Sequence, residues 1–155
     1  MSRDDAAFEK MLSALPVTTY HAGETILRDG SKTGRLFILK SGEVAVLKNS
    51  AEIARADQPG AVFGELAALL DQPHLADVRA LRDSDLHVGD VALLEKDSLL
   101  LLAVARTLAR RFVIAHESLV ALKNEIQTGP SPSAVRNVIA KMETQMMATQ
   151  ILIPF

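Results

Sequence analysis

The most informative part of this chain runs Gly60-Ala-Val-Phe-Gly-Glu-Leu-Ala-Ala-Leu-Leu-Asp-Gln-Pro-His-Leu-Ala-Asp-Val-Arg-Ala80. Within it, residues 64–70 are rich in helix formers and contain no β-branched side chain. This segment is too short to be stable as a free-standing helix. We therefore predict a helix of one to two turns inserted in a β structure and followed by a loop through Pro73.

The sequence on both sides of this segment predicts a β-sandwich or a barrel-like roll. Between residues 17 and 88, short apolar segments alternate with glycine, asparagine and proline turn signals, which is typical of such folds. The expected strands cover residues 17–20, 25–27, 36–39, 44–47, 52–54, 78–81 and 86–88. Ser41-Gly42 lies between two of these segments and predicts a hairpin turn.

Helical patterns flank the β region. Residues 4–15 repeat apolar side chains at helical spacing, and Pro16 ends that pattern. After Gly89 the sequence is helical to about residue 127, and Asp90 and Asp97 are the expected N-caps. Residues 98–127 contain neither glycine nor proline and predict one long helix.

Six apolar residues on this long helix follow alternating steps of four and three, which is the spacing of a helix that pairs with another helix. These expected dimer-interface residues are Leu108, Phe112, Ala115, Leu119, Leu122 and Ile126. A helix packed on its own domain needs a similar stripe, so this alternative stays open. The length and regularity of the stripe favour a homodimer. Three arginines on the same helix are expected to be solvated or to pair with nearby acids: Arg106, Arg110 and Arg111.

The C-terminal part of the chain begins with a break at residues 128–133, which contain one glycine and two prolines and predict a linker. Residues 134–155 predict a short helix followed by the apolar tail Ile151-Leu-Ile-Pro-Phe155. We expect this tail to pack against its own domain or against a protein partner. The expected organisation is therefore a domain over residues 1–127, a linker and this C-terminal segment.

Composition excludes several classes of function. The 155 residues include 17 Lys+Arg and 19 Asp+Glu, a balance that argues against nucleic-acid binding through bulk charge. The lack of cysteine excludes thiolate catalysis and Cys-ligated zinc, and the four histidines lack metal-ligand spacing. Since no nucleophile motif is present either, we expect no enzyme, metal or cofactor. The longest apolar run, residues 99–105, is far short of the roughly 20 residues of a membrane span, and no signal peptide is evident, so a cytoplasmic protein is expected.

The ordered glycines carry a specific resemblance. Residues 60–80, together with Ala22-Gly-Glu24, Gly30 and Leu36-Phe-Ile-Leu-Lys-Ser-Gly-Glu43, resemble the cyclic nucleotide-binding domain family. That family includes the bacterial catabolite activator protein, the regulatory subunit of protein kinase A and cyclic nucleotide-gated channels. The resemblance covers about residues 5–125. It implies a mainly β fold with α elements, a double-stranded, jelly-roll-like β-roll flanked by an N-terminal helix and a long C-terminal helix.

The resemblance also implies a phosphate-binding cassette built on the short helix at residues 64–70. There, backbone N–H groups face an anion, Gly64 permits its close approach, and Glu65 accepts a hydrogen bond from a ribose hydroxyl. The alternative for Glu65 is a charge that merely favours the first turn of a helix. The implied ligand-binding residues are Phe63, Gly64, Glu65, Leu66, Ala67, His74, Leu75 and Ala76.

One part of the cassette departs from the family pattern. Nucleotide-binding members carry Pro-Arg-x-Ala after the helix, whereas this chain has Pro73-His-Leu-Ala76. A histidine is mostly neutral at neutral pH and cannot replace the permanent charge and double hydrogen bond of arginine. At about 1.5–3 kcal/mol for each charge-assisted bond, losing two costs about 100-fold or more in affinity. Asp77 would repel a phosphate if it lay close to it; its expected partner is Arg79, and a phosphate contact by Arg79 is the alternative.

These observations lead to two hypotheses of different classes. The first is a non-enzymatic, homodimeric sensor in which a cyclic nucleotide or another small anion binds weakly and acts on the C-terminal helices by a population shift. The second is a module that has lost its ligand and serves in protein interaction or dimerisation through the long helix and the apolar tail. Direct DNA binding is not expected, because the residues after 127 contain no basic recognition helix.

Overall fold

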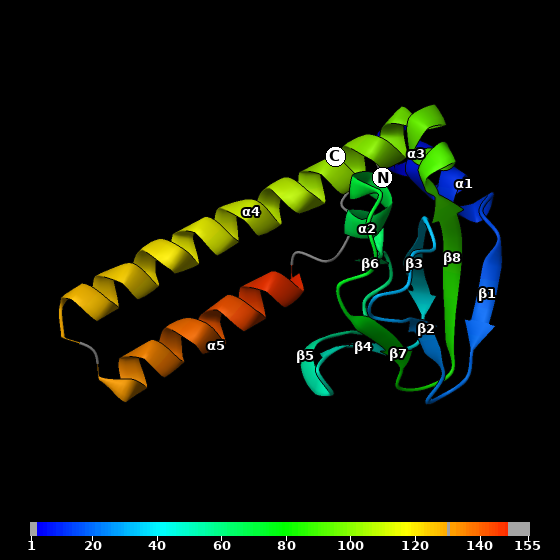
Figure 1. The fold of residues 1–155 in the computed structure, drawn as a ribbon. Helices are drawn as coiled ribbons and strands as arrows, with labels where there is room; N and C mark the ends of the chain where they lie inside the picture. Colours follow the sequence, from blue (N-terminus) through cyan, green and yellow to red (C-terminus); the bar gives the residue numbers. More distant parts are fainter. Residues whose placement is uncertain (1–2, 130, 149–155) are drawn as a thin grey trace.

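The computed structural model describes residues 3–129 and 131–148, which form a β-roll with helices above it and to its left in the view of Figure 1. The strands are β1 (Val17–Tyr20), β2 (Thr25–Leu27), β3 (Arg35–Ser41), β4 (Val44–Lys48), β5 (Ala51–Ala56), β6 (Val62–Phe63), β7 (Asp77–Ala80) and β8 (Ser84–Asp90). The helices are α1 (Arg3–Ser13), α2 (Glu65–Leu70), α3 (Val91–Lys96), α4 (Ser98–Gln127) and α5 (Pro132–Ala148).

The strands form two four-stranded antiparallel sheets, with the orders β1-β8-β3-β6 and β2-β7-β4-β5. Each sheet contains strands from distant parts of the chain, as a double-stranded β-helix requires. The predicted fold class is therefore confirmed. All seven expected apolar segments fall on strands, although the segment 78–81 runs one residue past the end of β7. The two-residue strand β6 was not predicted because it is too short to show a periodicity.

Two apolar cores share strand β3. Phe37 and Leu39 point between the sheets and belong to the core of the roll. Leu36 and Ile38 point the other way, into a second core with residues of α1, α3 and α4. This double burial explains why four consecutive residues of β3 are apolar instead of alternating with polar ones.

The two predicted N-caps begin the helices that follow the roll. The Asp90 carboxylate accepts a hydrogen bond from the backbone N–H of Leu93, at 2.9 Å, at the start of α3. The Asp97 carboxylate accepts from the N–H groups of Leu99 and Leu100, both at 3.0 Å, at the start of α4. Helix α4 has the predicted bounds, and its 30 residues span about 45 Å at 1.5 Å per residue.

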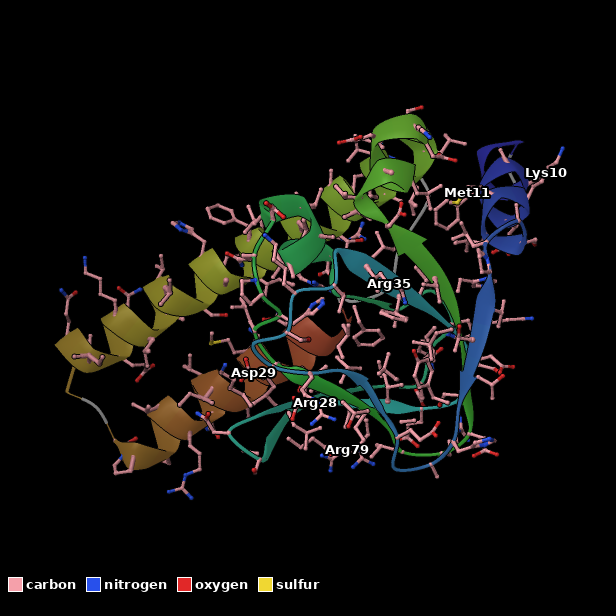
Figure 2. The ribbon with its side chains drawn as sticks, turned by 45° about the vertical axis from the view of Figure 1, so that its right-hand side comes forward. Lys10, Met11, Arg28, Asp29, Arg35 and Arg79 are labelled. Carbon is pink, nitrogen blue, oxygen red and sulfur yellow. The ribbon has the colours of Figure 1, made fainter. Side chains whose placement is uncertain are left out.

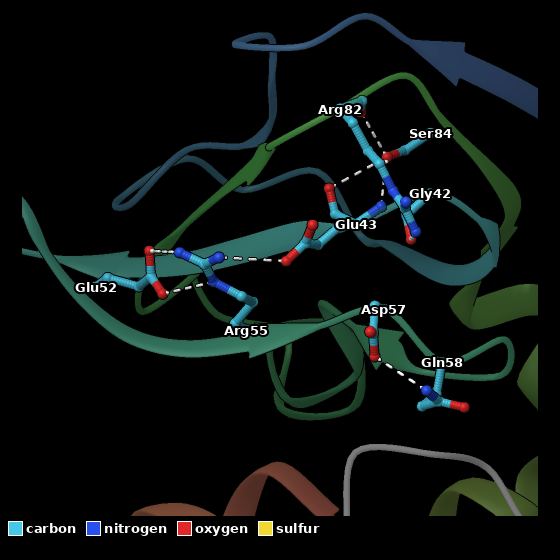
Figure 3. Close-up of polar contacts among 8 residues, drawn as sticks. All are labelled: Gly42, Glu43, Glu52, Arg55, Asp57, Gln58, Arg82 and Ser84. Carbon is cyan, nitrogen blue, oxygen red and sulfur yellow. Dashed lines mark hydrogen bonds and ion pairs between the residues drawn. The ribbon is translucent and has the colours of Figure 1, made fainter.

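The β3–β4 hairpin turns at Gly42, which has a φ of 105° and lies against Ser84 of β8. A Cβ added to Gly42 would lie 2.5 Å from the Ser84 Cα, so only glycine fits there. Ser84 Oγ accepts a hydrogen bond from the Glu43 N–H at 3.0 Å (Figure 3). On the same hairpin surface, Arg55 of β5 pairs with both Glu43 and Glu52.

Helix α5 returns alongside α4 and also contacts β5 (Figure 1). It begins at Pro132, inside the segment expected to be a linker, because proline is well suited to the first turn of a helix. The tail Ile151–Phe155 lies outside the described residues. Among the described helices, none combines the length and the apolar character that crossing a membrane requires.

Candidate functional site

A cavity of about 140 Å³ lies between strands of both sheets, helix α2 and one side chain of α4. All eight residues that the resemblance implied border it: Phe63, Gly64, Glu65, Leu66, Ala67, His74, Leu75 and Ala76. The apolar side chains of Leu27, Val46, Val62 and Val78 line the rest of its wall, and Arg111 completes it. The structure thus brings the predicted residues together, while their role in binding stays a prediction.

Gly64 gives helix α2 its position against the roll. It is the N-cap residue, with a φ of 82° and a ψ of 0° in the left-handed region. A Cβ on this residue would lie 2.7 Å from the Arg35 carbonyl oxygen and 3.3 Å from His74 Cε1. The space beside Gly64 is therefore limited by the neighbouring strand and the imidazole, and the expected close approach of an anion to this residue stays a prediction.

His74 is fixed by three hydrogen bonds and is only 4% exposed. Its Nε2 lies 2.7 Å from Thr33 Oγ1. Its backbone N–H donates to the Ser31 carbonyl at 2.8 Å, and its carbonyl accepts from the Gly30 N–H at 2.9 Å.

Burial lowers the pKa of His74 below its usual value of 6.5, and the nearby Glu65 carboxylate opposes this change only in part. The imidazole is therefore neutral at neutral pH, as expected from the sequence. It brings no permanent charge to the cavity.

Arg111 of α4 places a second charged side chain beside Glu65 at the cavity. Its Nη1 donates to Glu65 Oε1, in a pair whose side chains are 14% and 4% exposed. Its Nη2 is buried and has no hydrogen-bond partner among the described residues. The sequence did not predict this second group: besides the imidazole at the cassette position, an arginine from a distant helix borders the same cavity.

The sequence did contain a signal for Arg111. Leu100, Ala103, Val104 and Thr107 are fully buried against the roll, and Arg111 continues their spacing of three and four. The heptad spacing indicated the neighbouring apolar stripe instead. The expectation that arginines of this helix pair with nearby acids holds for Arg111, whose acid is near in space and distant in sequence.

The Asp77 carboxylate bonds to a backbone N–H group instead of forming the predicted pair with Arg79. Its Oδ1 accepts a hydrogen bond from the Asp29 backbone N–H at 2.7 Å, which ties β7 to the end of β2. Arg79 lies at the lower margin of the roll, away from α4 (Figure 2). Neither residue lines the cavity, so the structure supports neither a direct contact of Asp77 with an anion there nor the alternative phosphate contact by Arg79.

The six apolar residues of α4 expected at the dimer interface form an apolar seam, and their side chains differ in exposure. Phe112, Leu119 and Ile126, one heptad apart, are 72%, 62% and 59% exposed. Leu108, Ala115 and Leu122 are partly buried. Helix α5 packs on a different side of α4, where Ser118 and Ala121 face Val138 and Met142. The ring of His116 stacks on Phe112 at a centroid distance of 6.3 Å.

Comparisons with known proteins address the same part of the chain. Residues 17–88 match the model of the family described as "Cyclic nucleotide-binding domain". A cGMP-dependent protein kinase of Toxoplasma gondii is 37% identical over 76 residues, which are 49% of this chain and 8% of that protein. A cAMP-dependent protein kinase regulatory subunit of Aspergillus niger is 37% identical over 75 residues, 48% of this chain and 18% of that protein. The chain thus spans less than a fifth of the length of these relatives.

A solved structure has the same fold over most of the chain. The structure described as "Sp-2Cl-cAMPS bound to PKAR CBD2" superposes with a TM-score of 0.56 at 25% identity. The match covers 81% of this chain and 80% of that one. It extends beyond the β-roll, because residues 17–88 alone are less than half of this chain.

Proposed function

We propose, from the premise that residues 17–88 form a cyclic nucleotide-binding domain, that this chain is a cytoplasmic, non-enzymatic regulatory module. Its cavity receives a cyclic nucleotide or another small anion as a ligand. The observation that carries this proposal is the single cavity bordered by all eight residues of the expected site.

Affinity for a cyclic nucleotide is weak in this proposal, for two reasons. His74 is neutral and bonded to Thr33, so it offers a phosphate no permanent charge. The cavity of about 140 Å³ is also smaller than the roughly 300–1,000 Å³ typical of small-molecule sites. A whole nucleotide therefore has to widen the cavity or project from it, and this displacement lowers the net binding free energy.

The signal is transmitted through α4, because Arg111 of that helix borders the cavity. A ligand that favours one position of the Arg111 side chain also favours one position of the helix that carries it. Such a difference in affinity between two helix positions is all that a population shift requires.

The module acts as a homodimer in which the exposed seam of α4 meets the same seam of a second copy. Phe112, Leu119 and Ile126 are more than half exposed at intervals of seven residues, which is the pattern of one side of a paired-helix interface. The same exposed stripe favours the second candidate function, a module that binds no ligand and acts through protein interaction alone.

Thermal unfolding in the presence of ligand separates the two functions. A ligand that binds only the folded state raises the melting temperature by linkage. We expect cyclic AMP or cyclic GMP at millimolar concentration to raise it little, in keeping with weak binding. A saturable shift with micromolar affinity would contradict the weak-binding proposal. If neither thermal unfolding nor an NMR titration detects binding, the second function, a protein-interaction module without a ligand, is supported.

A further inference from the structure

The guanidinium group of Arg111 is only partly satisfied by its surroundings. Nη1 is bonded to Glu65, whereas Nη2 is buried without an acceptor among the described residues. A buried donor that carries charge is costly to leave unpaired, and arginine cannot relieve this cost by losing its proton. The side chain borders the cavity, and a turn of its guanidinium group would bring the unpaired nitrogen to an acceptor placed there.

The charges around the cavity specify the chemistry of that acceptor. Of the described residues that line it, Glu65, His74 and Arg111 have titratable or charged side chains. His74 is neutral, and Glu65 without Arg111 would give the cavity one negative charge, which repels anions. With Arg111 in place, the Glu65 charge is balanced, and an unpaired N–H of the charged guanidinium group remains as a donor. That donor suits an oxyanion, such as a phosphate group, better than a neutral carbonyl.

We propose that Arg111 is the residue that binds the anionic group of the ligand, with Nη2 donating to a phosphate oxygen while Nη1 keeps its bond to Glu65. This inference rests on the proposed function and adds to it the residue that selects an anion. The contact also explains how occupancy reaches the long helix. Residues 100–107 of α4 are anchored in the core of α1, α3 and α4, and Arg111 lies one turn beyond that anchored part.

The test compares a charged and an uncharged ligand in wild type and variants. Wild-type protein, Arg111→Gln, Arg111→Lys and Arg106→Gln are titrated with cyclic AMP and with adenosine, which lacks the phosphate, and binding is followed by ¹H–¹⁵N NMR at the amide of Gly64. Arg106→Gln is the matched control, since it removes the same charge from an exposed residue of the same helix. Melting temperatures show whether each variant is folded.

We expect Arg111→Gln to weaken cyclic AMP binding by about ten- to a hundredfold and to leave adenosine binding within twofold of wild type. Arg111→Lys keeps the charge but not the forked donor geometry, so we expect it to be intermediate. Arg106→Gln should match wild type.

Three results would overturn the inference. Unchanged or tighter binding of cyclic AMP by Arg111→Gln would overturn it and leave the proposed function in place. An equal loss of cyclic AMP and adenosine binding would show a structural role only. If cyclic AMP produces no shifts in wild type or in His74→Arg at millimolar concentration, the inference and the ligand-binding function both fail.

Discussion

Arg111 of α4 pairs with Glu65 of α2, and 46 residues of sequence separate the two. Glu65 is the residue for which the family resemblance implied a contact with a ribose hydroxyl. In this structure its carboxylate is bonded to the helix that leaves the β-roll. The pair therefore joins the centre of the candidate site to the element that carries the exposed apolar seam.

The replacement of arginine by histidine in the cassette can be reversed. We expect His74→Arg to create or strengthen cyclic nucleotide binding, at least tenfold in affinity, because a permanent charge and a forked donor are added at the cavity. Isothermal titration calorimetry with cyclic AMP and cyclic GMP measures the change. His74→Gln is the matched control, since it fills similar space without a charge. A variant that folds but gains no affinity would show that the shape of the pocket also blocks the site.

Gly64 is expected to be the most sensitive glycine of the site. Gly64→Ala combines a left-handed backbone with a Cβ 2.7 Å from the Arg35 carbonyl oxygen, so it should lower the free energy of unfolding by about 2–4 kcal/mol. Gly30→Ala is the control, because Gly30 also has a positive φ but nothing lies within 4 Å of its Cβ position. Its expected cost is about 1 kcal/mol. Urea denaturation of both variants tests this, and equal losses would argue against the steric contribution.

Stability should fall as the pH drops below about 6.5. Burial lowers the pKa values of both His74 and His87 in the folded protein, while the unfolded chain keeps values near 6.5. The unfolded state therefore binds more protons below that pH, and the stability present above it is lost as the pH falls toward the lowered pKa values.

Unfolding free energies of wild type and His74→Gln at pH 7.5 and pH 5.5 measure this effect. We expect a smaller loss between the two pH values in His74→Gln than in wild type. His116→Gln, a change of an exposed histidine, is the control and should behave like wild type. If His74→Gln loses as much stability on acidification as wild type, His74 does not contribute to the pH dependence.

The homodimer is tested at the centre of the α4 seam. Leu119→Glu places a charge where two apolar stripes would meet, so we expect it to convert a dimer into a monomer of 16.7 kDa. Val120→Glu is the matched control, because Val120 is also exposed but lies outside the seam, and it should remain dimeric. Sedimentation equilibrium gives the masses. A wild-type protein that is monomeric at 100 µM would remove the homodimer from the proposal.

The sequence by itself determined the local parts of this protein. Seven of the eight strands, the short helix after Gly64, the two aspartate N-caps and the full extent of α4 were predicted. The helices and their caps depend on interactions within about four residues, and the strands appear as short apolar segments between turn residues, so periodicity and capping residues record both directly. The glycine framework added the family resemblance, and with it the eight residues that meet at one cavity.

Only the tertiary structure decided which side chains complete that cavity. The partner of His74 is Thr33, 41 residues away, and the cation of the site comes from α4 instead of the cassette. Two stripes run along α4, one buried against the roll and one exposed, and the sequence alone does not fix which of them faces the cavity. Burial of Leu100, Ala103 and Val104 in the shared core sets the rotation of the helix, and this rotation carries Arg111 to Glu65.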